Sequence, residues 1–96
     1  MTAAETALLE HFETPALVVR QGSVSFANQA ARDLLGAHVV GQDARIAIRD
    51  PQVVALINSP HGGSAIVEEL SVRSSRWKVS CHVLPGGGRL VVLDDL

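Results

Sequence analysis

The sequence has 96 residues, of which 47% are hydrophobic and only 3% aromatic, and its formal net charge is −2. This length fits one small domain whose core is built mainly from aliphatic side chains. The small charge gives no electrostatic reason to expect a nucleic acid or an anionic membrane surface as partner. No apolar run is long enough to span a bilayer, and we expect no signal peptide.

Cys81 is the single cysteine of the sequence. One thiol cannot form an internal disulfide or a multi-thiolate metal site, and it fits a reducing, cytoplasmic location. The thiol alternates with polar residues in a strand-like run, so we predict a buried small side chain rather than a redox centre. No two histidines have the spacing of metal ligands, and we predict no metal site.

Residues 2–12 predict a short amphipathic helix. Thr2 and Glu5 have the spacing of a capping box, in which each side chain satisfies a free amide of the first turn. Its apolar stripe consists of Ala4, Leu8, Leu9 and Phe12. A helix this short is not stable alone, so the stripe packs either on the domain's own sheet or on a second copy. We predict residues 1–13 to be a dimerisation helix with Leu8, Leu9 and Phe12 at its interface.

The stretch from Pro15 to Gly36 predicts a β-hairpin that leads directly into a helix. The apolar run 16–20 is followed by a tight turn at Gln21-Gly22 and by a second strand. In that second strand, alternation predicts one buried face that carries Val24 and Phe26. Asn28 then caps a short helix that Gly36 ends. The Asn28 side chain is explained by this cap, and a ligand contact is the alternative.

The segment 37–63 is less regular. Gly41 and Asp43 indicate a bend, and Ile46 and Ile48 are expected to be buried. Asp50-Pro51 is typical of a helix start, with Asp as cap and Pro in the first turn. The apolar face of this helix carries Val53, Val54 and Ile57.

The last third of the chain predicts three β-strands. Residues 66–72 form the first, and Ser74-Ser75 is predicted to be the turn that follows. The second strand alternates clearly, with Trp77, Val79, Cys81 and Val83 on one face. Residues 85–88 form the next turn, and 90–93 form a final apolar strand expected at the centre of the sheet. Segregated helices and strands of this kind predict an α+β domain with one antiparallel sheet.

The order of these elements resembles that of a PAS domain. The step Phe26-Ala27-Asn28 is similar to the point where a PAS strand opens a helix in bacterial sensor histidine kinases. The ending Leu90–Asp95 resembles the strand that precedes an Asp-apolar-Thr signature, although the Thr is absent here. The similarity is greatest to phosphate-regulon-type sensor kinases. It implies that residues 14–96 form a five-stranded antiparallel sheet with short helices between the second and third strands.

This resemblance implies a sensory and dimerising module that relays a signal to a kinase core outside this chain. Asp95 is then the predicted relay residue. A small apolar ligand is also compatible with such a module, and the residues that we predict to contact it are Phe26, Asn28, Arg49 and Trp77. Arg49 has a surface ion pair as its alternative reading. A membrane is expected only through the parent protein.

The sequence lacks the motifs of the common PAS cofactors. Cys81 is outside the helix context of a reactive flavin-site cysteine, and the helix opened by Asp50 contains no histidine for haem. We therefore expect neither flavin nor haem. The alternative function is a small-ligand-binding PAS module of a non-kinase regulator, in transcription or in cyclic-dinucleotide signalling.

Overall fold

The computed structural model describes residues 3–71 and 74–96, with side chains described for residues 7–68 and 76–96. In chain order the elements are α1 (Ala3–Glu10), β1 (Ala16–Arg20), β2 (Ser23–Ala27), α2 (Gln29–Leu35), the 3-10 turn η1 (Ala37–Val39), α3 (Ala44–Ala47), α4 (Pro51–Asn58), β3 (Gly63–Ser71), β4 (Ser74–Val83) and β5 (Arg89–Asp95). The predicted capping residue Thr2 and the strand residue Val72 lie outside the described residues.

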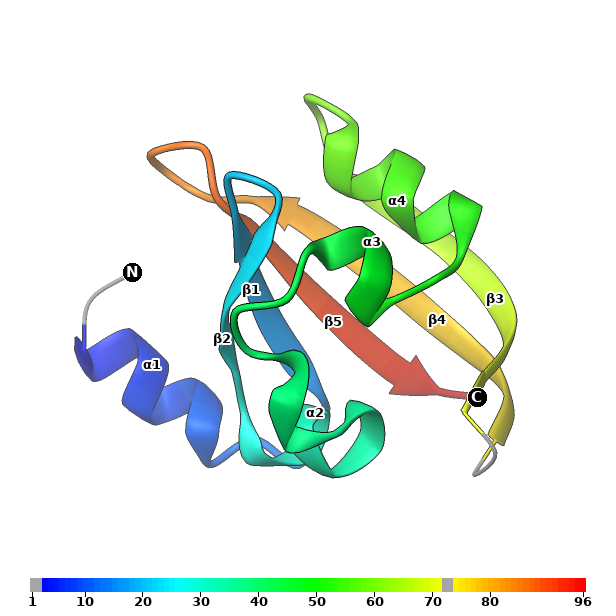
Figure 1. Ribbon diagram of the computed structural model, residues 1–96, viewed down its shortest axis with the longest axis horizontal. Helices are drawn as coiled ribbons and strands as arrows, with labels where there is room; N and C mark the ends of the chain where they lie inside the picture. Colours follow the sequence, from blue (N-terminus) through cyan, green and yellow to red (C-terminus); the bar gives the residue numbers. More distant parts are fainter. Residues whose placement is uncertain (1–2, 72–73) are drawn as a thin grey trace.

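The five strands form one antiparallel sheet in the order β2-β1-β5-β4-β3. The prediction that the last strand is central is confirmed, because β5 pairs with β1 on one side and with β4 on the other. The helices α2, α3 and α4 lie together over one face of this sheet (Figure 1). The α+β class with short helices between the second and third strands is therefore confirmed.

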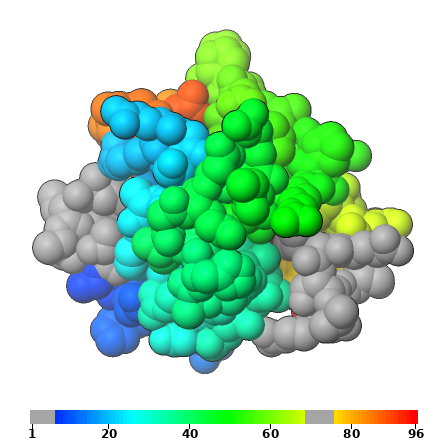
Figure 2. All heavy atoms as spheres, in the orientation of Figure 1, coloured from blue at the N-terminus to red at the C-terminus, as the bar shows by residue number. Residues whose placement is uncertain are grey.

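The core lies between the sheet and these helices. Strand residues such as Leu17, Val79 and Leu93 point into it, and helix residues such as Ala31 and Val53 meet them from the other side. Figure 2 shows the helical segment, coloured cyan to green, covering the middle of this face. The predicted burial of Cys81 is confirmed, since the thiol belongs to the same cluster. Aliphatic packing thus joins the two layers.

The β1–β2 hairpin turns at Gln21 and Gly22, as predicted, and both residues have positive φ. Positive φ at both central residues matches the right-handed twist of the strands that the turn joins. The predicted common face of Val24 and Phe26 is wrong. A bulge between Val18 and Val19 pairs Val19 with Val24 but Val18 with Phe26. Val24 therefore joins the core, whereas Phe26 lies half-buried beside Val18 on the opposite face.

The helix starts follow the predicted side-chain chemistry. The Asp50 carboxylate accepts hydrogen bonds from the backbone N–H groups of Gln52 at 2.8 Å and Val53 at 3.3 Å. Asp43 caps α3 in the same way, through the N–H of Arg45. The burial predicted for Ile48 is confirmed, but Ile46 is 51% exposed. The reason is that α3 is a single turn, which buries Ala44 and leaves its opposite side in solvent.

Two features of the C-terminal strands differ from prediction. Ser74 and Ser75 belong to β4, where Ser74 pairs with Ser71, so the predicted turn at these serines is wrong. β4 begins three residues before Trp77, the first residue of the alternating run. Backbone pairing, rather than side-chain polarity, decides where the strand begins. Val83, predicted to share the buried face of Trp77, is 44% exposed at the other end of β4, where it pairs with Arg89 at the start of β5.

Gly62 marks the entry to β3 at a very close approach of two backbones. Its φ is +71°, and a Cβ there would lie 2.3 Å from the carbonyl oxygen of Cys81. Gly41 has a similarly positive φ of +91° but no atom within 4 Å of such a Cβ. The two positions therefore share backbone strain and differ in the space around them.

We expect Gly62→Ala to reduce the free energy of unfolding by about 2 kcal/mol more than Gly41→Ala, because only the first forces the β3–β4 pairing apart. Urea denaturation of both variants and of the parent chain measures the difference. Equal losses in the two variants would contradict the close approach at Gly62.

Candidate functional site

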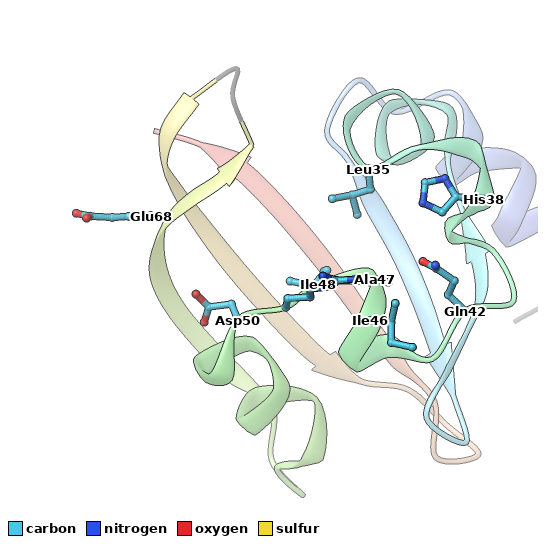
Figure 3. A pocket seen from close by; sticks show the side chains of 9 residues that line it. Leu35, His38, Gln42, Ile46, Ala47, Ile48, Asp50 and Glu68 are labelled. Atoms are coloured by element: carbon cyan, nitrogen blue, oxygen red, sulfur yellow. The ribbon is translucent and has the colours of Figure 1, made fainter.

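A cavity of about 500 Å³ opens between the helical layer and β3. We call it the helical pocket, and Figure 3 shows the residues that line it. They are Leu35, His38, Gln42, Ile46, Ala47, Ile48, Arg49, Asp50 and Glu68. The apolar residues come from the end of α2 and from α3, and the charged residues lie at the start of α4 and on β3.

Arg49 is the predicted ligand residue that the structure brings to the helical pocket. It lies immediately before the Asp50 cap, whose Oδ1 is already occupied by two backbone N–H groups. The Glu68 side chain points away from the other labelled residues (Figure 3). Arg49 is the one arginine among the residues that line this pocket, and its role in binding a ligand carboxylate stays a prediction.

A second cavity, of about 400 Å³, lies where the α1–β1 linker, α2 and the ends of β4 and β5 meet. We call it the terminal cleft. Its lining consists of Phe12, Glu13, Pro15, Gln29, Ala30, Asp33, Trp77 and Asp95. Three of these residues were predicted to have different roles: Phe12 in pairing, Trp77 in ligand contact and Asp95 in signal relay. Trp77 and Asp95 also face each other across the β4–β5 ladder.

Trp77 is almost fully buried, and its indole Nε1 has no hydrogen-bond acceptor among the described residues. An unsatisfied buried donor costs about 1–3 kcal/mol, so it is uncommon in a folded domain. The apolar body of the ring belongs to the core cluster together with Val79 and with Val67, its cross-strand partner. Trp77 therefore combines a packing role with an unused donor.

Asn28 is the most completely bonded polar side chain of the predicted set. It is fully buried, and its Oδ1 accepts hydrogen bonds from the N–H groups of Ala31 at 2.9 Å and Ala16 at 3.0 Å. Its Nδ2 donates to the carbonyl oxygens of Thr14 at 2.9 Å and Leu9 at 3.0 Å. These four bonds use the whole capacity of an amide. The cap interpretation is confirmed, and a ligand could contact this amide only by displacing one of the four.

Phe26 lines neither the helical pocket nor the terminal cleft. The bulge in the hairpin turns it to the sheet face opposite the helices, next to Val18. The structure therefore does not bring the four predicted ligand residues together. Arg49 lies at the helical pocket and Trp77 at the terminal cleft, whereas Asn28 is bonded inside the domain and Phe26 lies on the other face of the sheet.

The predicted helix through Phe12 is too long, because α1 ends at Glu10 and Phe12 lies in the linker that follows. Much of the predicted apolar stripe is exposed. Leu8 is 65% exposed and Phe12 is 54% exposed, whereas Leu9 is partly buried. The end of α1 is tied to α2 by an ion pair in which Arg32 donates to both carboxylate oxygens of Glu10, at 2.8 and 3.3 Å. This hydrogen bond from Arg32 lowers the pKa of Glu10 below its usual value. The sequence analysis missed the pair because its members are 22 residues apart.

No protein-family model matches this sequence, and no curated protein matches it at a significant level. In the described ranges, no group of three or more His, Cys, Asp or Glu side chains is arranged to hold a metal ion. Over the same residues, no helix has both the length and the apolar character needed to cross a membrane. The geometry of the domain therefore carries the functional argument.

We expect Asn28→Ala to lower the free energy of unfolding by about 3 kcal/mol, because it removes a helix cap and leaves buried backbone groups without partners. Asn58→Ala, at an exposed position near the end of α4, is the matched control and should change stability by less than about 0.5 kcal/mol. Urea denaturation measures both. Similar small losses in the two variants would show that the four bonds of Asn28 are not needed.

Burial raises the pKa of the Cys81 thiol above its usual value, although Arg89 partly opposes this shift. Little reactive thiolate then forms at neutral pH, and the sulfur is also inaccessible. We expect Cys81 to react with a disulfide reagent at pH 8 at least about a hundredfold more slowly in the native chain than in guanidinium. Reaction rates that agree within a few fold would contradict the buried position.

Proposed function

We propose that this chain is a sensory and dimerising PAS-type module of a sensor histidine kinase. In this proposal it relays a signal to a kinase core outside the chain. The observation that supports it best is the antiparallel sheet with short helices inserted between its second and third strands. This arrangement is compatible with a PAS-like fold. The step Phe26-Ala27-Asn28 also lies where β2 passes into α2.

The pairing part of this proposal rests on α1. Leu8 on α1, and Phe12 two residues beyond its end at Glu10, expose large apolar side chains to solvent. Apolar surface of this kind is stabilised when a second surface covers it. A second copy of the chain offers the same stripe, as expected for a twofold-symmetric interface. We propose a homodimer that forms through this helix.

The relay part rests on β5. This strand is the centre of the sheet and pairs with both β1 and β4. A shift of β5 would therefore change its pairing with both neighbours. Asp95 is the last residue of the strand and lies opposite Trp77 at the terminal cleft. We propose that Asp95 passes the signal onward to the output domain. We also propose a cytoplasmic location, with any membrane anchor in another part of the parent protein.

The helical pocket favours a second candidate function, a ligand-binding module of a non-kinase regulator. Its volume of about 500 Å³ is sufficient for a small molecule. The apolar side chains of Leu35 and Ile48 would contact the body of such a ligand, and Arg49 would contact a carboxylate. In this function the pocket, rather than α1, receives the signal.

Native mass spectrometry of the purified chain tests the first proposal. We expect a dimer, and we expect Leu8→Gln and Phe12→Gln each to weaken it at least about tenfold, because a polar amide would be buried at the interface. Val83→Gln is the matched control, since Val83 is exposed at the distant end of β4 and should leave the dimer unchanged.

A monomer at all concentrations would contradict pairing through α1, and so would equal dissociation of the Val83→Gln control. A retained mass of a few hundred daltons on the monomer would instead favour the ligand-binding function. Loss of that added mass in Arg49→Gln would assign it to the helical pocket.

A further inference from the structure

Polar contacts attach the end of α1 to the rest of the domain. Near its end, the carbonyl oxygen of Leu9 accepts a hydrogen bond from Asn28 Nδ2 at 3.0 Å, and Glu10 pairs with Arg32. The large side chains of Leu8 and Phe12 remain mostly exposed. A few directional bonds therefore fix the end of α1 against α2 and the linker.

Arg32 is held in place from its own side as well. Its guanidinium donates to the carbonyl oxygen of Ala27, where β2 ends, and to Oε1 of Gln29 at 2.9 Å. These contacts orient the fork of the guanidinium so that two of its N–H groups meet the two oxygens of Glu10. A two-point contact of this type fixes direction as well as distance.

The same bonds continue from α1 into the central strand. Asn28 Nδ2 also donates to the Thr14 carbonyl at 2.9 Å, and the next carbonyl, that of Pro15, accepts from the N–H of Leu93 in β5 at 2.9 Å. The short α1–β1 linker is therefore bonded to Asn28 on one side and to β5 on the other. Ala16 closes the path, because its N–H donates to Asn28 Oδ1 and its own carbonyl accepts from Asn28 N–H.

We propose that the Glu10–Arg32 pair and the Asn28 amide form a latch that couples the position of α1 to the hydrogen bonding of β5. When α1 is held, Thr14 and Pro15 are fixed and the Leu93–Pro15 bond is formed. When α1 is displaced, the Asn28 amide loses its bond to Leu9, the linker loosens, and the end of β5 at Asp95 is released. This inference rests on the proposed function in one respect, since it takes α1 as the receiving element and β5 as the transmitting one.

The strengths of the two ties suit such a role. Glu10 and Arg32 both keep part of their side chains in water, so a partner that binds α1 can replace their contact at little cost. Asn28, by contrast, is fully buried, so the loss of one of its partners has a high free-energy cost that favours a rearrangement around it. The exposed pair therefore opens first, and the buried amide transmits the change to the linker. Coupling requires an element of this kind, with two arrangements that both ends influence.

Amide hydrogen exchange followed by NMR tests the latch in the isolated chain. We expect Glu10→Ala to speed exchange about fivefold at the N–H groups of Ala16 and Leu93 through local opening. The Ala44 N–H, which donates to Gly22 at the other end of the hairpin, should stay within about twofold of its original rate. Glu68→Ala is the matched control, because Glu68 is an exposed acid on β3, the edge strand at the far side of the sheet from the β1–β2 hairpin.

Faster exchange at Leu93 and Ala16 in Glu10→Ala alone, with Ala44 unchanged, supports the latch. Acceleration confined to α1 would show that the helix moves without the strand, and equal acceleration at all sites would show only a loss of global stability. Either result overturns the coupling. The test is independent of pairing, since exchange is measured whether the chain is a monomer or a dimer, so failure of the proposed dimer is recognised separately by mass spectrometry.

Discussion

The arrangement of the N-terminal half depends on one buried amide, that of Asn28. Its transfer from water into the core is costly unless every donor and acceptor finds a partner. The required partners belong to four different segments: the end of α1, the linker at Thr14, the start of β1 and the first turn of α2. A helix cap needs only the last of these. The other three bonds join elements that apolar packing alone would not align in one register.

This constraint extends to the sheet through the pairing of β1. Once Ala16 is fixed against Asn28, β1 enters the sheet at a set position and pairs with β5, where Ala16 lies opposite Val92. The bulge between Val18 and Val19 then decides which side chains of the hairpin reach the core. Since β5 pairs with a strand on each side, the last strand of the chain lies at the centre of the sheet. Local capping and the global strand order are thus parts of one bonded structure.

The sequence predicted those features whose causes are local. The Gln21-Gly22 turn, the Asn28 and Asp50 caps and the alternation of β4 from Trp77 to Cys81 each depend on residues within a few positions, and each is confirmed. The central position of β5 was predicted from its apolar sequence, but two other features that depend on partners far along the chain were not predicted. The bulge reverses the face of Phe26 because one strand has an extra residue relative to the other, and no pattern within β2 shows this. The Glu10–Arg32 pair joins residues that only the folded chain brings together.

The predicted site residues follow the same division. Arg49 lies at the helical pocket next to the Asp50 cap, a feature that the local sequence predicts. Trp77 and Asp95 meet at the terminal cleft because of the register of β4 with β5, which the local sequence does not show. The two cavities lie on different parts of the domain, one against β3 and one at the end of β5. A ligand in the first would have to act through the edge of the sheet. The linker after α1, in contrast, is hydrogen-bonded both to Asn28 and to Leu93 in the central strand, so the proposed input from α1 would follow bonds that already exist.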